Sequence, residues 1–230
     1  MIRDKRKTFC YLYVVFVIVL FLVLGNISVD QLYAGVEVGG SELSYMLYFM
    51  LFFTRVCFVM GDCERYIQSY AVNEVVRTKS RKIIWKNCVV SAVRSTLIFY
   101  LWIFICALIC SVVYLPGTIL LHERMLVEMA VFYGVDLLLL LLQLFMEILT
   151  DSRVAMIVVG CFYISSLIAG DGLFHLGIPK KIYWILFPNI GMYKRIIGDL
   201  SVYEVLVFLA VVYVVLYLLG RHMIRRKDIL

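Results

Sequence analysis

The sequence predicts an all-α, polytopic membrane protein with six transmembrane helices and with both its N- and C-termini in the cytoplasm. Three observations support this fold class. The composition is 64% hydrophobic and only 17% charged, whereas soluble domains carry roughly 45–50% apolar and about 25% charged residues. Six apolar stretches approach the roughly 20 residues that a helix needs to cross a bilayer. The Lys and Arg residues are divided unevenly between the segments that join these stretches.

The apolar stretches form a single transmembrane domain, residues 1–230. They are expected to be helical, because a spanning segment in lipid must satisfy every backbone N–H and C=O internally. The first stretch follows a basic N-terminus and lacks a small-residue cleavage site, so we expect a retained helix rather than a signal peptide. The expected helices are residues 9–26, 45–61, 88–115, 125–149, 154–170 and 205–219.

The basic residues predict the orientation. Of the 22 Lys and Arg residues, fifteen lie in the termini, the connector after the second helix and the turn at Arg153, and five lie in the other loops. Because cytoplasmic loops carry the excess of positive charge, the fifteen mark the cytoplasmic side of a multi-pass protein of the cell membrane. The charges form no single basic patch, so we expect membrane lipid rather than nucleic acid as a partner.

The loop at residues 171–204 is too apolar for free solution and too short to cross the membrane. Pro179 and Pro188 divide it into two parts. We expect a re-entrant hairpin in the outer interface, with Tyr183 and Trp184 at the depth of the lipid headgroups. An ordinary surface loop with an aromatic anchor is the alternative.

No sequence motif for catalysis is present. The chain lacks the GxxxxGK loop that cradles nucleotide phosphates, the HExxH zinc motif and the GxSxG nucleophile elbow. No cysteines and histidines occur at zinc-ligand spacing. We therefore expect no catalytic residue, no metal site and no cofactor in this chain, and we expect any ATP hydrolysis to take place on a separate subunit.

The fourth expected helix carries a polar stripe. Helical periodicity places its members on one face, about 100° wide. Ionisable side chains are costly in a bilayer, so the stripe should face protein or a water-filled substrate path. The stripe consists of Glu128, Asp136, Gln143 and Glu147.

Two arginines lie inside the expected helices, near their cytoplasmic ends. Arg55 and Arg94 have similar depths in the second and third helices, and Glu147 is about one turn from the inner end of the fourth. These positions predict an inner charge cluster of Arg55, Arg94 and Glu147. In the alternative, each arginine extends separately to lipid phosphate.

The connector at residues 62–87 has the pattern of a short amphipathic helix followed by a basic run. Its apolar ridge and surrounding charges would suit a groove on a cytoplasmic partner. A simple anchor to anionic lipid is the alternative. The residues that we expect at a partner interface are Tyr70, Val75, Arg77, Ser80 and Arg81.

The chain resembles the type-2 ABC transporter permeases in this connector, in its C-terminus and in its six-helix plan. The segment Ser80–Lys86 is similar to the Ser-Arg, Ile and Lys pattern that ends the coupling segment of that family, and Arg225–Leu230 is similar to its basic tail followed by Asp-Ile. The outer hairpin at 171–204 is a further similarity. The chain departs from the family pattern before the first helix, where many members have an amphipathic helix and Met1–Thr8 is too short for one. In this it resembles the small permeases of Gram-positive bacteria, which are linked to bacteriocin export or self-protection.

This resemblance implies the permease subunit of an ABC exporter. Such a subunit would move a drug, an antimicrobial peptide or a lipid-like substrate. The implied partners are a cytoplasmic ABC ATPase subunit and a second permease chain, identical or different. Two alternatives remain: an intramembrane enzyme that uses the acids of the fourth helix, and an immunity or sensor membrane protein without transport activity. A neighbouring gene for a P-loop ATPase without membrane helices would favour the exporter.

Overall fold

The computed structural model describes residues 2–24, 29–67, 82–114, 123–196 and 200–226. In these residues the chain is helical and contains no β-strand. Six of its helices are long and apolar enough to cross a membrane. The prediction of an all-α protein with six candidate membrane spans is therefore confirmed.

The six long helices correspond one to one with the expected spans. Several extend further than the apolar stretch itself, because polar residues can continue a helix beyond the hydrocarbon layer without changing its hydropathy signal. The clearest extensions are the start of the first helix, the start of the third and both ends of the sixth. The helices are α1 (Ile2–Leu24), α3 (Glu42–Val59), α5 (Lys82–Tyr114), α6 (Glu123–Leu149), α7 (Ser152–His175) and α9 (Val202–Arg226).

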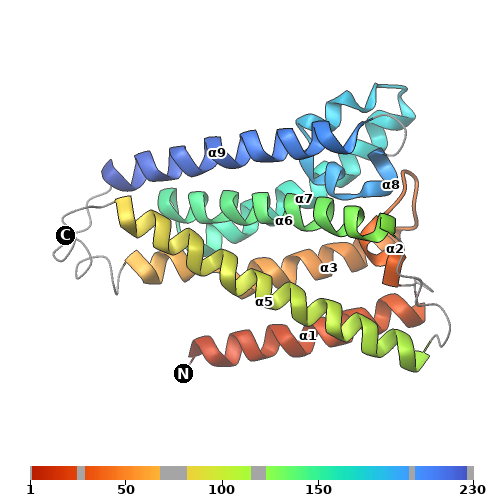
Figure 1. Cartoon of the computed structure of the whole chain (residues 1–230), viewed down its shortest axis with the longest axis horizontal. Coiled ribbons are helices and arrows are strands. Elements are labelled where there is room, and N and C mark those ends of the chain that lie inside the picture. Colours follow the sequence, from red (N-terminus) through yellow and green to blue (C-terminus); the bar gives the residue numbers. More distant parts are fainter. Residues whose placement is uncertain (1, 25–28, 68–81, 115–122, 197–199, 227–230) are drawn as a thin grey trace.

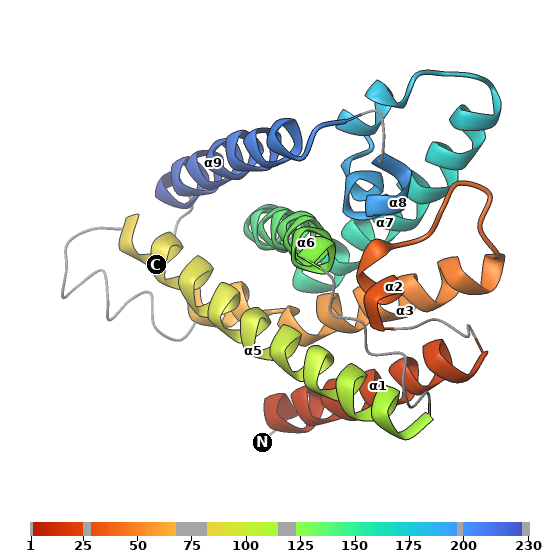
Figure 2. The same ribbon diagram turned by 45° about the vertical axis from the view of Figure 1, so that its right-hand side comes forward.

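Helix α6 lies at the centre of the bundle, where it contacts α3, α5, α7 and α9 (Figures 1 and 2). Helix α1 packs against α3 and α5 on one side. The leucine-rich part of α6 is buried within the chain, including Leu138–Leu141 and Leu144. A helix that is buried on nearly all sides is expected to be apolar all round, which explains why polar residues occupy only one stripe of α6.

The start of α5 and the end of α9 lie together at the end of the molecule that carries both termini (Figure 1). The ring of Trp85 is fully buried, and its Nε1 donates a hydrogen bond to the backbone oxygen of Tyr217 at 2.8 Å. Gly220 lies directly against this ring, and a Cβ atom there would collide with it. The absence of a side chain at position 220 therefore permits the close contact between the two helices.

The connector between α3 and α5 differs in extent from the expected 62–87. Gly61 adopts a positive φ of 72° after α3, and residues 62–67 are again helical. Helix α5 begins at Lys82, so Ile83–Lys86 belong to the membrane helix and not to the connector. The five residues expected at a partner interface, Tyr70, Val75, Arg77, Ser80 and Arg81, lie outside the described residues.

Two short segments, called the outer segments after the side of the membrane on which the sequence predicts them, fold against the bundle. Between α1 and α3 the chain forms the short helix α2 (Val29–Ala34), which contacts α6. After α7 it forms two 3₁₀ helices, η1 (Lys180–Trp184) and η2 (Phe187–Gly191), and the short helix α8 (Tyr193–Ile196). Helix η2 contacts both α6 and α7.

This outer segment departs from the expected hairpin in two respects. Helix α7 continues to His175, so the segment begins later than residue 171. Tyr183 is only 1% exposed, and Trp184 packs against Phe208 of α9 with 4.8 Å between the ring centroids. Both rings are thus packed against protein, where aromatic side chains gain apolar contact, and their depth at the level of the lipid headgroups stays a prediction.

Candidate functional site

All four residues of the polar stripe on α6 are buried in the chain. Their exposed fractions are 9% for Glu128, 8% for Asp136, 0% for Gln143 and 1% for Glu147. The stripe faces α3, whose Arg55 is also buried. A buried polar group must find hydrogen-bond partners or it destabilises the fold, so the contacts of these side chains define the site.

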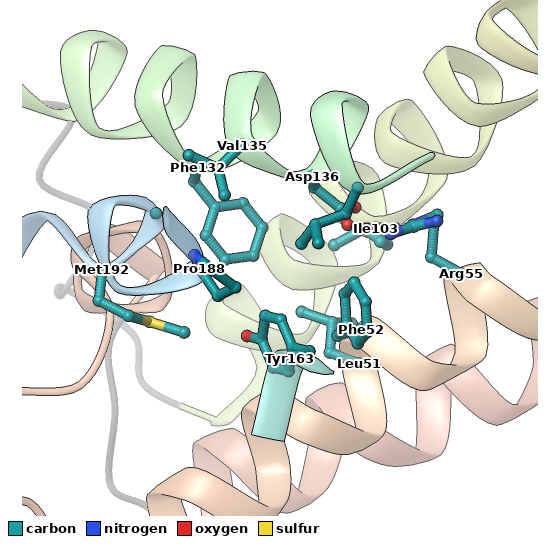
Figure 3. Close-up of a pocket in the computed structure, with 12 residues that line it drawn as sticks. Leu51, Phe52, Arg55, Ile103, Phe132, Val135, Asp136, Tyr163, Pro188 and Met192 are labelled. Carbon is teal, nitrogen blue, oxygen red and sulfur yellow. Dashed lines mark hydrogen bonds and ion pairs between the residues drawn. The ribbon is translucent and has the colours of Figure 1, made fainter. Parts of the chain in front are cut away.

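The core of the site is an ion pair between Arg55 on α3 and Asp136 on α6 (Figure 3). Arg55 Nη2 and Nε donate to Asp136 Oδ1 at 2.6 and 3.0 Å. The second carboxylate oxygen accepts a hydrogen bond from the hydroxyl of Tyr100 on α5. Three membrane helices are thus joined at one carboxylate, and both of its oxygens have a donor.

Gln143 and Glu147 continue the contact between α6 and α3 towards the end of the bundle that carries the termini. Gln143 Oε1 accepts from Arg55 Nη1 at 3.1 Å, and its Nε2 donates to the carbonyl of Val56 at 3.0 Å. Glu147 accepts from the backbone N–H groups of Gly61 at 2.8 Å and Cys63 at 3.3 Å. Glu147 therefore caps the helical residues that follow the turn at Gly61, which is a favourable place for a carboxylate.

The expected inner charge cluster of Arg55, Arg94 and Glu147 does not form. Arg55 pairs with Asp136, Glu147 binds backbone N–H groups, and Arg94 lies on the exposed face of α5. Side chains on a helix lean towards its N-terminus, so Arg55 extends away from the level of Glu147. Asp136 and Glu147 are separated by about 16 Å along α6, and one guanidinium cannot reach both.

A second buried network surrounds Arg195 of α8 at the opposite end of the bundle. Arg195 is 0% exposed. Its Nη2 lies 3.2 Å from Asp171 Oδ1 of α7 and also bonds to the hydroxyl of Tyr45 of α3. Its Nη1 bonds to Asn189 Oδ1 of η2. Two backbone carbonyls complete the set, with Val36 O at 3.1 Å from Nε and Leu167 O at 3.2 Å from Nη1.

The partners of Arg195 are held in turn by one another. Asp171 accepts from the hydroxyl of Tyr45 and, at 3.3 Å, from the backbone N–H of Gly39. Asn189 Nδ2 donates to the carbonyls of Ser166 at 2.7 Å and Leu186 at 2.9 Å. The Arg195 network thus fastens the segment after α7 to α3, to α7 and to the loop after α2.

A small apolar cavity lies between the two networks (Figure 3). Arg55 and Asp136 line one side, and Pro188, Gly191 and Met192 of the outer segment line the other. Phe52 and Tyr163 stack within it at 3.9 Å between ring centroids. The cavity volume of about 20 Å³ is close to the space of a single water molecule. Of the polar stripe, Asp136 lines this small cavity.

Sequence reasoning did not identify the Arg195 network. Arg195 was counted only as one of the five positive charges in the outer loops, and Asp171 only as the start of a hairpin. The side chains of the Arg195 network come from four separate segments of the chain, so no spacing in the sequence connects them. The one available signal is the apolar sequence on either side of Lys194 and Arg195, since a charge that is buried among apolar residues must be paired.

The chemistry open to this arrangement is limited by its own hydrogen bonds. Asp136 is paired with Arg55, and Glu147 is bonded to two backbone N–H groups. Among the described residues, no three His, Cys, Asp or Glu side chains are grouped so that they could hold a metal ion. The two networks are suited to holding the helices in one arrangement.

Comparison with known proteins shows one relationship. A family model described as "Protein of unknown function (DUF2705)" matches residues 10–230. No curated protein and no solved structure matches the chain. The match covers nearly all of the chain, including both buried networks, and the protein therefore belongs to the DUF2705 family.

Proposed function

We propose that this protein is the membrane-spanning permease subunit of an ABC exporter. It would move a drug, an antimicrobial peptide or a lipid-like substrate, with energy from a separate cytoplasmic ATPase. The contact of Trp85 with Tyr217 and Gly220 is the observation that carries this proposal. Trp85 belongs to the segment Ser80–Lys86 that resembles the permease family, and the contact joins it to the part of α9 that directly precedes the similar basic tail.

This contact provides a mechanical route from a cytoplasmic partner to the membrane interior. A force on the connector would act on the start of α5, and the buried Trp85 would carry it to α9. Helix α9 packs along α6, which bears the polar stripe. Because packed helices move as rigid bodies against one another, displacement of α5 and α9 would alter the contacts of Asp136 and Gln143 with Arg55.

The two buried networks suit the resting state of such a transporter. The Arg55–Asp136 pair joins α3, α5 and α6, and the Arg195 network closes the opposite end over the small cavity. In the proposed cycle, the ATPase supplies the work that separates these elements. The exposed apolar side of α9, which includes Val207, Val211 and Val214, would face lipid or the second permease chain.

The proposed orientation can be tested with reporter fusions. A reporter joined after Lys86 or after Arg226 should be cytoplasmic, and one joined after Gly40 should be external, because the excess of Lys and Arg marks the cytoplasmic side. An alkaline phosphatase and a fluorescent protein used in parallel give opposite signals on the two sides. An external signal at Lys86 would contradict the proposed orientation.

The proposed coupling can be tested with the substitutions Tyr70→Asp and Val75→Asp in one chain. Two charges on the apolar ridge should prevent docking in a partner groove, so we expect at least a tenfold loss of ATPase co-purification and of substrate-stimulated hydrolysis. The variant should still reach the membrane. The partner should be identified as a P-loop protein by photolabelling with an ATP analogue.

Lys79→Gln with Lys82→Gln is the matched control, because it removes two charges beside the expected interface but changes none of the five residues expected there. Loss of binding in this control alone would indicate a charge-based lipid anchor. An unchanged ATPase interaction in the Tyr70→Asp and Val75→Asp variant would contradict the proposed docking surface.

A further inference from the structure

The end of the bundle at which α1 begins and α3 ends carries an excess of positive charge around one carboxylate. Asp62 Oδ2 lies 3.1 Å from Lys7 Nζ, and Asp62 Oδ1 lies 3.6 Å from Arg65 Nη2 and 3.8 Å from Arg6 Nη2. Three cations thus share one carboxylate. Glu147 is a second carboxylate nearby, since it accepts from the backbone N–H groups on both sides of Asp62. The basic group of Arg6, Lys7 and Arg65 keeps a surplus of positive charge over these two carboxylates.

Arg6 in this basic group has unused hydrogen-bonding capacity. Its Nε and Nη2 atoms are shielded and have no hydrogen-bond acceptor among the described residues. The side chain as a whole is nevertheless 22% exposed, so Arg6 lies close to the surface. A guanidinium without acceptors is unfavourable, and an anion with several oxygens would satisfy its fork geometry.

An apolar groove runs along the same two helices. Tyr13 of α1 and Met46, Phe49, Met50 and Phe53 of α3 line it, with a volume of about 330 Å³. The four α3 residues recur at the spacing of one helix face. Met46 is 56% exposed, so the groove lies on the outside of the bundle, where membrane lipid would surround it.

The groove is aligned with the basic group. Arg6 and Tyr13 are seven positions apart on α1 and differ by only about 20° around the helix, so they lie on one face. The separation along the axis is about 10 Å. Since Lys7 of α1 contacts Asp62 after the end of α3, the groove lies on the same two helices as this charged end, about two helical turns further into the apolar part of the bundle.

We infer that Arg6, Lys7, Arg65 and the groove form a binding site for one anionic phospholipid. The phosphate oxygens accept hydrogen bonds from Arg6 and Arg65, and one acyl chain lies along Tyr13, Phe49, Met50 and Phe53. The charge surplus matches an anionic headgroup, and the aligned apolar groove distinguishes a lipid from a free phosphate. This site is separate from the polar stripe and does not depend on the proposed transport activity.

The test uses the purified full-length chain in detergent and native mass spectrometry. Phosphatidylglycerol and phosphatidylcholine with identical acyl chains are compared as probes. One Lys or Arg near an anionic surface contributes about a fivefold effect, so the variant Arg6→Gln with Arg65→Gln should lose phosphatidylglycerol binding by about 25-fold. Arg6→Lys with Arg65→Lys should retain most of it. Arg94→Gln, which removes an exposed cation from α5, should change it by less than twofold.

Two further measurements distinguish the source of the phosphate. A phosphatidylglycerol with a photoreactive group in its acyl chain should label the peptide that contains residues 46–53, and this labelling should fall in the Arg6→Gln and Arg65→Gln variant. Soluble glycerol phosphate should not displace the lipid. Equal retention of the two lipids, an unchanged preference in the double variant, or displacement by glycerol phosphate would each overturn the inference.

Discussion

Replacement of Asp136 by leucine is expected to lower the free energy of unfolding by about 3–5 kcal/mol, because it leaves the buried Arg55 without its counter-charge. Arg55 is only 1% exposed and cannot reach water without rearranging α3. Tyr100 loses its acceptor in the same variant. Unfolding of the purified protein in mixed micelles with rising denaturant concentration would measure the effect. Insertion into the membrane should be retained, since leucine is favourable there.

A double replacement distinguishes the contribution of the ion pair to stability from that of the surrounding packing. Asp136→Leu with Arg55→Leu removes both charges and should recover most of the lost stability, as buried ion pairs are often replaceable by apolar residues. Arg55→Leu alone should be about as harmful as Asp136→Leu, whereas Arg94→Leu, the matched exposed arginine, should have little effect. If Asp136→Leu unfolds at the same denaturant concentration as the parent, the ion pair does not stabilise the fold.

The same variants can be used to test the proposed substrate path. If the polar stripe takes part in transport, the stable double variant should not transport. It lacks the two charges that would contact the substrate or would exchange their ion-pair partners during the cycle. Full transport by the double variant would assign the pair a purely structural role. Labelling of a cysteine at position 136 by a water-soluble reagent would show whether water reaches this level during the transport cycle.

Replacement of Arg195 by methionine is the second change with a large expected effect, about 2–5 kcal/mol. Methionine keeps an unbranched apolar stem but has no guanidinium and donates no hydrogen bond, so Asp171, Asn189 and two backbone carbonyls lose a buried partner. The loss of these hydrogen bonds should make the segment that follows α7 less stable and more mobile. Hydrogen exchange followed by mass spectrometry should therefore show faster exchange in residues 187–196.

Lys194→Met is the matched control for Arg195→Met. Lys194 is the preceding residue, but its partner Glu37 is 68% exposed, and the two charges are 3.4 Å apart. Exposed ion pairs contribute only about 0–1 kcal/mol, so this control should leave both the stability and the exchange pattern nearly unchanged. Equal effects of the two substitutions would show that the Arg195 network does not hold the outer segment.

The sequence predicts the helices of this protein better than it predicts their contacts. Apolar stretches identify the spans because lipid requires long helices, and the 3.6-residue period places Asp136 and Gln143 on one side of α6. The partner of Arg55 was predicted incorrectly, since a comparison of depths neglects the lean of side chains along a helix. The Arg195 network was not predicted, since its members meet only after α3, α7 and the outer segment are packed.

The close pairing of Arg55 with Asp136 has an electrical consequence. An isolated elementary charge moved across a membrane potential of 100 mV changes the free energy by about 2.3 kcal/mol. With 2.6 Å between their charged groups, the two residues form a neutral dipole, and a displacement that carries them together transfers no net charge through the field. A helix movement that keeps the pair intact is therefore insensitive to voltage, whereas one that separates the pair is opposed or assisted by the membrane potential according to its direction.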